Sequence, residues 1–500
     1  MLKQLKEATN LTTTTNGAVT HVSSQSHLLD FFARGGSMRN VSDTEIRQVF
    51  SKAFSENPEY ALKALFLHRD IREGNGERRL FRILTKWLSE TDLPALEALI
   101  PLIAEYGRYD DVVALLDTQA SRKAGEVIAK QLTEDVENLE QGKSISLLAK
   151  WLPSENASSY VTVKRAKKLI KGLGISAKQY RKTTVALRKH LNLLEQNMSQ
   201  KTWDKVDYSK LPSQAMIKHK QAFYRNDVAK YTGFLDSLVK NVEGVKVNSG
   251  SLFPYQLVEK VIGTGWSWHR SIAPSDRVLY DQMWKALPNR VEGAENSIAV
   301  VDTSGSMSGM PINVAVSLGM YVAERNEGIF HNHFINFSDR PKLVEIKGKD
   351  FVDKVQNVVN AEWGGSTNLE AVFDLILDTA IRNNMPQSEM PTRLFIISDM
   401  QFNQCVTTGG RRGVELTFFQ SMRVKFAQAG YALPKLVFWN VDGSYGQSPV
   451  TKDTPETQLV SGFSQNLFKA ILESASTNPY DMMMETLDSE RYAPIKHHTN

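Results

Sequence analysis

The chain has 500 residues, enough for two or three domains, and 41% of them are apolar, which suffices for packed cores. No apolar stretch reaches about 18 residues and none lies near the N-terminus, so we expect neither a membrane span nor a secretory signal. The single cysteine, Cys405, excludes a disulfide framework and a zinc site of several thiolates, and it fits a reducing compartment such as the cytoplasm.

The net charge of +5 conceals an asymmetry between the two halves of the chain. Residues 1–290 carry 43 lysines and arginines against 31 acidic residues, whereas residues 291–500 carry 17 against 24. Opposite charges on the two halves favour two domains with different partners. Two ordinary solvated surfaces would give the same totals, so the counts alone do not decide.

The first half is expected to be helical after a flexible arm. Residues 1–25 are rich in Thr, Ser and Asn and show no clear period, which is typical of a loose arm. Ser42-Asp-Thr-Glu45 has the spacing of a capping box, and Pro58 marks the first turn of the next helix. Further helices are expected at 78–88, 94–106, 110–116, 125–139, 145–152, 162–171, 177–196, 213–223 and 227–242. Short helices without strands predict an all-α, HEAT-like helical repeat over residues 26–292, a solenoid or a ring, although no strict repeat period is visible.

After Glu295 short apolar strands alternate with helices. Strands are expected at 297–301, 330–337, 342–346, 393–398, 435–440 and 457–462, and helices at 311–326, 351–360, 368–382, 413–429 and 464–472. This alternation predicts a doubly wound, mostly parallel α/β sheet of the Rossmann-like class over residues 293–475. Residues 476–500 are acidic and are expected to form one helix and a tail.

The strongest local signal is the run from Asp302 through Ser304 to Ser306, which directly follows a buried strand. Thr367, in a loop before a helix, and Asp399, at the end of another buried strand, add two oxygen ligands at the same edge of the sheet. Two carboxylates and three hydroxyls suit a hard cation. We therefore expect these five residues to bind Mg²⁺, with Mn²⁺ and Ca²⁺ as alternatives. A site that keeps the hydrogen bonds without the metal is the opposing interpretation.

In this order the five residues resemble the metal-ion-dependent adhesion site (MIDAS) of von Willebrand factor A domains. The resemblance implies a cation that lacks one ligand and completes its coordination with a carboxylate of an acidic protein partner. The acidic tail, residues 481–490, is the internal alternative for that ligand.

Longer segments resemble a family of uncharacterised proteins from phages, bacteria and eukaryotes that is catalogued as a domain of unknown function. These segments are RDIREGNGERRLF at 69–81, EYGRYDD at 105–111, SLLAKWLPS at 146–154, WGGSTN at 363–368 and VFWN at 437–440. The resemblance runs from about residue 40 to 475. More distantly, the family is similar to Ro ribonucleoproteins, which join a ring of helical repeats, the TROVE module, to a von Willebrand factor A domain and bind small non-coding RNAs. The resemblance implies an RNA-binding helical module and a phage or bacterial source.

One basic region fits this implication. Residues 161–190 carry no acidic side chain and ten basic ones, which on helices would form a positive stripe for RNA phosphates. The ten are Lys164, Arg165, Lys167, Lys168, Lys171, Lys178, Arg181, Lys182, Arg188 and Lys189. Stacking on unpaired bases would fall to Tyr180, His190, Trp203, His219 and Tyr224. A solvated basic face with aromatic residues in the core is the alternative. A second cluster, Arg72, Arg78 and Arg79, is as readily explained by ion pairs with Glu73 and Glu77.

No positive signal for catalysis is present in the sequence. Gly142-Lys-Ser144 lacks the rest of a phosphate-binding loop, no nucleophile elbow occurs, and Cys405 has no evident histidine partner. We therefore expect a non-catalytic, Ro-like RNA-binding protein whose second domain binds an acidic partner through a divalent cation. The alternative is a protein–protein adaptor, or a particle- or virion-associated scaffold, that uses the metal site without RNA.

Overall fold

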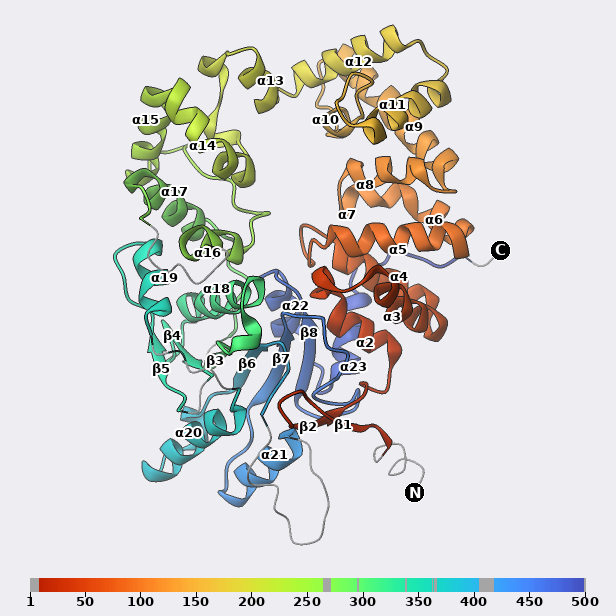
Figure 1. Ribbon diagram of the computed structural model, residues 1–500. Coiled ribbons are helices and arrows are strands. Elements are labelled where there is room, and N and C mark those ends of the chain that lie inside the picture. Colours follow the sequence, from red (N-terminus) through yellow and green to blue (C-terminus); the bar gives the residue numbers. More distant parts are fainter. Residues whose placement is uncertain are drawn as a thin grey trace. The chain divides into compact units, whose positions relative to one another are not determined.

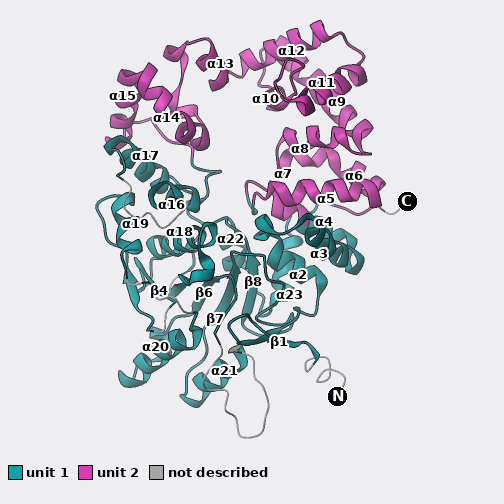
Figure 2. Cartoon of the chain, in the orientation of Figure 1, with its two compact units in different colours: residues 1–64, 73–75, 249–493 teal, residues 65–72, 76–248, 494–500 magenta. Residues whose placement is uncertain are grey.

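The computed structural model describes residues 9–263, 271–294, 296–337, 340–361, 363, 367–403 and 418–498. The chain divides into two compact units, which are described separately here (Figure 2). Unit 1 comprises residues 1–64, 73–75 and 249–493, and unit 2 comprises residues 65–72, 76–248 and 494–500.

Unit 2 consists of helices joined by short turns (Figure 1). Its elements are α5 (Arg78–Thr91), α6 (Leu93–Leu99), η2 (Ile100–Leu102), α7 (Ile103–Tyr106), α8 (Tyr109–Ala114), η3 (Leu115–Asp117), α9 (Ser121–Glu140), α10 (Leu148–Trp151), α11 (Tyr160–Leu173), α12 (Ala177–His190), α13 (Leu194–Ser199), η4 (Trp203–Lys205), η5 (Tyr208–Lys210), α14 (Ser213–Asn226) and α15 (Val228–Val239). Residues 76–248, all of them described, contain no strand, in agreement with the sequence prediction. Helices close in the chain pack together, among them α5 with α6, α7 with α8 and α14 with α15. Closure of the repeats into a ring stays a prediction.

Two predicted helices of unit 2 are interrupted. The helix expected at 177–196 ends at His190, and Asn192 follows with a left-handed φ of 45° before α13 begins. The helix expected at 94–106 is broken by η2, where Pro101 has no amide hydrogen to donate. In both places the apolar helical pattern continues along the sequence, but the local backbone conformation interrupts the helix.

A buried ion pair lies at the centre of the first helices of unit 2. The guanidinium of Arg69, the last residue of α4 (Pro58–Arg69), donates from Nε and Nη2 to Asp111 Oδ2 at 2.9 and 2.7 Å. Only 2% of the Arg69 side chain and 0% of the Asp111 side chain is exposed. Arg82 Nε donates to Asp111 Oδ1 at 2.8 Å, and the Arg108 amide donates to Oδ2 at 3.2 Å. A Cβ at Gly107 would lie 2.7 Å from Asp111 Oδ2, so the close approach of this backbone requires glycine.

Unit 1 contains a six-stranded sheet of order β5-β4-β3-β6-β7-β8. The strands are β3 (Ser297–Val301), β4 (His333–Asn336), β5 (Leu343–Glu345), β6 (Arg393–Ser398), β7 (Lys435–Asn440) and β8 (Thr457–Ser461). Edge strand β5 runs antiparallel to β4, and all other neighbours are parallel. Every residue of β3 and β8 is buried, as expected when both faces of a parallel sheet are covered. The predicted α/β sheet is therefore present.

The remaining elements of unit 1 surround this sheet. They are α2 (His27–Gly35), η1 (Met38–Asn40), α3 (Asp43–Glu56), α16 (Pro254–Ile262), α17 (Pro274–Lys285), η6 (Gly305–Met307), α18 (Met310–Arg325), α19 (Phe351–Val359), α20 (Leu369–Arg382), η7 (Gln387–Glu389), α21 (Phe418–Gln428), α22 (Leu467–Glu473) and α23 (Pro479–Leu487). Helix α18 packs on β3, β4 and β6, α2 and α23 pack on β8, and α16 packs on α18. Helices α2, α3, α16 and α17 thus belong to unit 1, although the sequence placed them in the helical domain that ends at residue 292. A helical period does not reveal which neighbour the apolar face will cover.

The N-terminal residues form a hairpin instead of the expected flexible arm. Strand β1 (Leu11–Thr13) pairs antiparallel with β2 (Val19–His21). Single bridges join Gly17 to Asn403 and His21 to Ser448. The composition suggested disorder, but the β-branched threonine run before Asn16-Gly17 is itself a hairpin signal, and Gly17 has the required positive φ, 87°.

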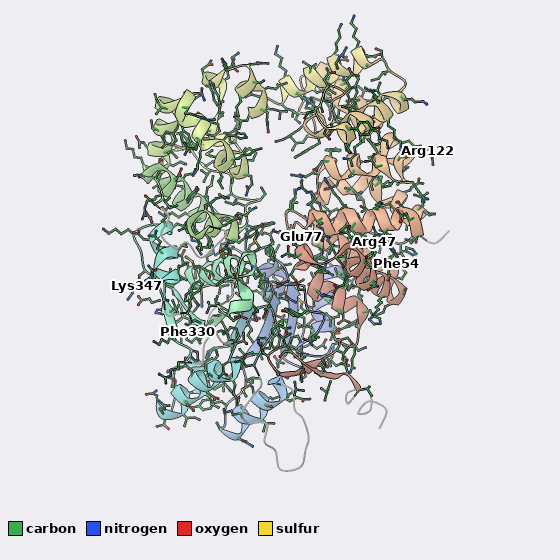
Figure 3. The ribbon with its side chains drawn as sticks, viewed as in Figure 1. Arg47, Phe54, Glu77, Arg122, Phe330 and Lys347 are labelled. Carbon is green, nitrogen blue, oxygen red and sulfur yellow. The ribbon has the colours of Figure 1, made fainter. Side chains whose placement is uncertain are left out.

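Replacing Asp111 with alanine should destabilise unit 2 by about 3–5 kcal/mol, because the buried Arg69 guanidinium would lose its counter-charge. Urea unfolding followed by circular dichroism would measure this loss. The matched control is Asp117→Ala, which removes the half-exposed partner of Arg165 and should cost at most about 1 kcal/mol. Equal losses for the two variants would show that the buried ion pair contributes no more to the free energy of unfolding than the surface pair. Arg122, which projects from α9 (Figure 3) and is 76% exposed, forms a surface ion pair with Glu126 that can serve as a second control.

Candidate metal centre

The two predicted acidic ligands emerge from neighbouring strands at the same level. Val301 of β3 is in register with Ile397 of β6, and the amide of Asp302 donates to the Ile397 carbonyl at 3.0 Å. Asp302 therefore leaves β3 beside Ser398, one residue before Asp399. Both carboxylates lie at the carboxyl edge of the sheet, and only 0% of Asp302 and 1% of Asp399 is exposed.

Asp302 is held by two donors. The amide of Ser304 donates to its Oδ1 at 2.9 Å, and the Ser398 hydroxyl donates to its Oδ2 at 2.6 Å. Burial raises the pKa of Asp302 to about 6, and the nearby charge of Asp399 acts in the same direction. The hydrogen bonds oppose this shift without cancelling it. In the absence of a cation, the site thus holds its negative charge at an energetic cost.

Asp399 has one oxygen that is not used by the protein. Its Oδ1 accepts from the Gln401 amide at 3.0 Å, whereas its buried Oδ2 has no hydrogen-bond donor among the described residues. Burial raises the pKa of Asp399, and the Gln401 amide and Ser306 hydroxyl oppose the rise. The following residue, Met400, has a left-handed φ of 66°, which is unusual for a residue with a side chain. Strain of this kind is typical of functional turns.

The three hydroxyl residues predicted as ligands lie at the start of η6 and in the segment before α20. The oxygens of Ser304 and Ser306 are 3.1 Å apart, with Ser304 buried and Ser306 exposed. Thr367 is 1% exposed, and its Oγ1 donates to Asn403 Oδ1 at 2.6 Å. Asp302, Ser304, Ser306 and Asp399 thus interact with one another, and Thr367 is tied through Asn403 to the loop that carries Asp399.

This donor set fits a hard divalent cation. Two buried carboxylates that raise each other's energy and an unpaired Oδ2 on Asp399 need a positive charge between them. The donors are all oxygens, which suits Mg²⁺, Mn²⁺ or Ca²⁺ more than a soft metal. No group of three or more His, Cys, Asp or Glu side chains that could hold a metal is found among the described residues, so the candidate centre would rely on two carboxylates and on hydroxyl oxygens.

The acidic tail is engaged elsewhere. Its helix α23 begins with Asn478 as the cap, and Asn478 Nδ2 donates to Asp481 at 2.7 Å. Glu485 accepts from Ser474 at 2.7 Å, and Asp488 accepts from Lys63 at 2.9 Å. These three carboxylates are therefore not directed to the metal centre, which weakens the case for an internal sixth ligand.

The ten predicted RNA-binding residues lie on α11 and α12, five on each helix, and they fall into two groups. Four have structural partners: Arg165 bonds to Asp117, Lys168 to the Leu116 carbonyl, Arg181 to Glu155, and Arg188 to the carbonyls of Ala149 and Leu152. The other six are exposed, and no ion pair joins them to a described residue: Lys164, Lys167, Lys171, Lys178, Lys182 and Lys189. Only these six are free to meet an external anion.

The predicted stacking residues are largely unsuitable. Tyr180 is 2% exposed and donates its hydroxyl to the Pro153 carbonyl at 2.7 Å, so its ring cannot receive a base. The rings of Trp203 and Tyr224 pack edge-on against Phe223 and Tyr231 in a partly buried cluster. His190 is exposed and His219 is half-buried. The sequence prediction missed Tyr160, the first residue of α11, which is 80% exposed. Its position directly after the capping Ser159 would have indicated an exposed first turn.

Two residues of the second basic cluster, Arg72 and Arg78, form ion pairs with acidic residues other than those expected. Arg72 pairs with Glu105 and Arg78 pairs with Asp110, each at 3.7 Å. Burial and the nearby charges of Arg108 and Arg82 lower the pKa of Arg78. Sequence neighbours suggested Glu73 and Glu77, whereas these two ion pairs use acidic residues of the 105–111 segment.

Comparisons with known proteins show relatives along the whole chain. The description "Domain of unknown function (DUF2828)" matches residues 14–122 and 157–296, and "Domain of unknown function (DUF7788)" matches residues 296–499. The uncharacterized protein L728 of Acanthamoeba polyphaga mimivirus is 34% identical, over 97% of this chain and 89% of that protein. Among solved structures, the Ro (RSR) protein of Deinococcus radiodurans is similar with a TM-score of 0.44 and 13% identity, over 90% of this chain and 99% of that one. The family match begins at residue 14, not 40, and therefore includes the tip and the second strand of the N-terminal hairpin.

Among the helices that the structure describes, none is long and apolar enough to cross a membrane.

Replacing Asp302 with asparagine should raise the melting temperature of the metal-free protein at pH 7. The pKa of Asp302 is raised from 3.8 to about 6, so the folded state loses stability from this group as the pH rises across that interval. Asparagine keeps the shape without the charge. Thermal unfolding in EDTA would show the gain at pH 7, and the gain should shrink near pH 4.

The matched control is Asp353→Asn, because hydrogen bonding to Arg277 lowers the pKa of Asp353 and its charge therefore stabilises the fold. This control should melt at a lower temperature than the parent. A lower melting temperature for Asp302→Asn as well would contradict the interpretation that the two buried charges repel each other.

Proposed function

The chain belongs to the same family as the mimivirus protein L728, and on this premise we propose that it is a non-catalytic protein that binds RNA and an acidic protein partner. The partner would bind through a divalent cation at the edge of the unit 1 sheet. The observation that carries the proposal is the unpaired Oδ2 of Asp399 beside the buried carboxylate of Asp302. A cation between the two carboxylates would offset the unfavourable energy of their burial and mutual repulsion.

The cation site is proposed to be of the MIDAS type in a von Willebrand factor A-like domain. Asp302, Ser304, Ser306, Thr367 and Asp399 would hold Mg²⁺, and the cation would supply an electrophilic centre for one further oxygen ligand. Exposed Ser306 lies on the open side of the site. A carboxylate from a partner protein is the ligand that matches this geometry and charge.

The absence of catalysis is proposed from the environment of the hydroxyls. Ser304 and Ser306 bond to each other, and Thr367 donates its proton to an asparagine amide. The same serine hydroxyls also contact the carboxylates of Asp302 and Asp399, which in this proposal are occupied by a cation and do not act as general bases.

RNA binding is proposed for the lysine surface, which we define as Lys164, Lys167, Lys171, Lys178, Lys182 and Lys189. The three lysines of α11, Lys164, Lys167 and Lys171, follow helical spacings of three and four residues, which places them on one side of the helix. Lys178 and Lys182 are likewise one turn apart on α12. Six unpaired ammonium groups attract a polyanion and release its counterions. Exposed Tyr160 adds a ring on which an unpaired base could stack.

The alternative function is an adaptor or a particle-associated scaffold that uses the cation site without RNA. It predicts that freshly purified protein carries no nucleic acid, whereas the RNA-binding proposal predicts a raised ratio of absorbance at 260 and 280 nm.

Replacing Asp302 with alanine should abolish Mg²⁺ and Mn²⁺ binding, because the remaining oxygens would no longer balance a dication. Isothermal titration calorimetry on the full chain measures the affinity, and circular dichroism verifies the fold. The control is Asp442→Ala, which removes a nearby carboxylate that bonds Ser444 and should leave the metal stoichiometry unchanged. Normal metal affinity in Asp302→Ala would rule out the proposed site.

Replacing Lys164, Lys167 and Lys171 with glutamine should weaken RNA binding and flatten its dependence on salt. Each lost phosphate contact removes about 0.7–0.9 from the slope of log affinity against log salt concentration. Fluorescence anisotropy with a labelled single-stranded RNA at several salt concentrations measures the slope. The control replaces three exposed lysines elsewhere in unit 2, Lys201, Lys240 and Lys246, and changes the net charge equally. Identical slopes for the two triple variants would show that the lysine surface is only a solvated face.

A further inference from the structure

The tip of the N-terminal hairpin, residues 14–17, lies on the loop that follows Asp399. Thr14 Oγ1 donates to the Phe402 carbonyl at 2.7 Å. Thr15 donates to Gln401 Oε1 from its amide at 3.0 Å and from its hydroxyl at 2.9 Å. Gly17 forms the bridge with Asn403. The hairpin tip therefore contacts three consecutive residues of the metal loop, 401–403.

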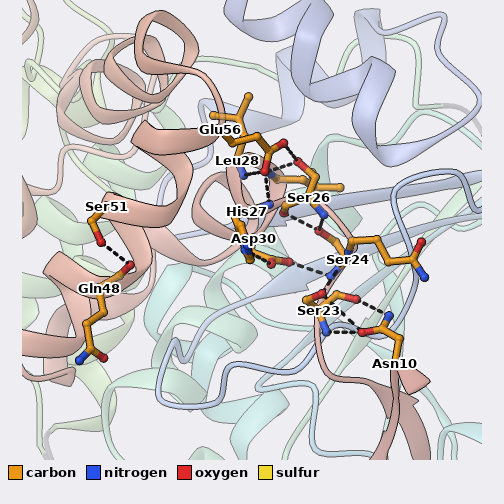
Figure 4. A network of polar contacts seen from close by, with 12 residues as sticks. Asn10, Ser23, Ser24, Ser26, His27, Leu28, Asp30, Gln48, Ser51 and Glu56 are labelled. Carbon is orange, nitrogen blue, oxygen red and sulfur yellow. Dashed lines mark hydrogen bonds and ion pairs between the residues drawn. The ribbon is translucent and has the colours of Figure 1, made fainter. Parts of the chain in front are cut away.

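The base of the hairpin is anchored independently of its tip. Asn10 Nδ2 donates to the Ser23 carbonyl at 2.9 Å, and the Ser24 amide donates to Asp30 at 2.8 Å (Figure 4). Ser26 Oγ donates to Glu56 Oε1 at 2.6 Å, also within this network. On the other side, Gln447 Nε2 donates to the Thr13 carbonyl at 2.7 Å. Loss of one contact at the tip would leave these anchors in place.

Asn16 is the residue of the tip that reaches a metal ligand. Its Nδ2 donates to Thr367 Oγ1 at 3.1 Å and to the Gln401 carbonyl at 2.7 Å. Thr367 Oγ1 in turn donates its own proton to Asn403 Oδ1 at 2.6 Å. The Thr367 hydroxyl therefore lies between two asparagine side chains, one from the N-terminus and one from the metal loop.

These two contacts determine how the Thr367 hydroxyl is oriented. A hydroxyl has one proton and two acceptor lone pairs. Asn403 takes the proton and Asn16 takes one lone pair, so a single lone pair remains. A threonine hydroxyl that lacked these partners would rotate, and it would point either its proton or a lone pair at a cation. In the observed arrangement the proton points to Asn403, and the remaining lone pair is available to a cation.

We propose that the N-terminal hairpin is part of the metal centre, in which Asn16 and Asn403 position the Thr367 hydroxyl as a cation ligand. The inference rests on the proposed cation site and adds a positioning residue that lies 351 residues from Thr367 in the sequence. Groups that orient a metal ligand from behind typically contribute about 10–100-fold to metal affinity.

The test is the affinity for Mg²⁺ and for Mn²⁺, each measured alone by calorimetry on the full chain. Asn16→Ala should weaken binding about 10-fold without altering the circular dichroism spectrum. The matched control is Thr15→Ala, which removes a side-chain bond from the same tip to Gln401 but none to Thr367. It should bind the metal as the parent does. If Asn16→Ala does not fold, Asn16→Leu retains the side-chain size without the amide and replaces it. Equal affinities in the parent and the Asn16 variant would overturn the proposal.

A double-mutant cycle separates positioning from a general loosening of the hairpin. If Asn16 acts through the hydroxyl, Asn16→Ala should have no further effect on metal affinity in a Thr367→Ala background. Additive losses would show that the hairpin acts in some other way and would also overturn the proposal. The parent and Asp302→Ala distinguish the two levels of inference. No metal binding by the parent rejects the cation site itself, whereas normal binding that Asp302→Ala abolishes and Asn16→Ala preserves rejects only the role of the hairpin.

Discussion

The repulsion between two buried carboxylates is the constraint on which the carboxyl edge of the sheet depends. Asp302 and Asp399 leave adjacent parallel strands, β3 and β6, whose register brings them to the same level. The protein answers with local donors: the Ser304 amide, the Ser398 hydroxyl and the Gln401 amide. At the left-handed turn of Met400, the Met400 amide donates to the Ser398 hydroxyl and the next amide, that of Gln401, donates to Asp399. These neutral donors reduce the repulsion without removing it.

The two units meet the problem of buried charge in opposite ways. In unit 2, Asp111 lies against Arg69 and Arg82, so the chain supplies the opposite charge itself. In unit 1, no described cationic side chain forms an ion pair with Asp302 or Asp399. A buried anion with an internal counter-charge belongs to the architecture of the fold, whereas one that lacks it depends on something from solution. This contrast separates the structural acid Asp111 from Asp302 and Asp399, the two acids for which we propose cation binding.

How much could be predicted depended on how local the determining interactions are. The bounds of β3, β6 and β7 coincide with the sequence prediction, because a strand buried on both faces is an uninterrupted apolar run. The places of Asp302 and Asp399 follow from those strands. The hairpin was missed because the contact that buries Thr14 is to Phe402, 388 residues later in the chain. Tyr180 was misjudged because sequence cannot show on which side of a basic helix a ring lies. The helices α2 and α16 were assigned to the wrong unit because a helical apolar period does not indicate which part of the chain the helix packs against.

The separation between the hairpin and its docking loop also has a consequence for synthesis on the ribosome. Thr14 emerges 388 residues before its acceptor at Phe402, which at about 5–20 residues per second is a delay of roughly 20–80 seconds. Residues 76–248 form one continuous stretch of unit 2 and can condense during that interval. The strand edges of the hairpin stay unpaired until the segment around Phe402 has been made, and unpaired edges promote aggregation when they are apolar. Its threonine- and asparagine-rich composition, which resembles disorder when read alone, limits the apolar surface that this element exposes before its partner segment has been made.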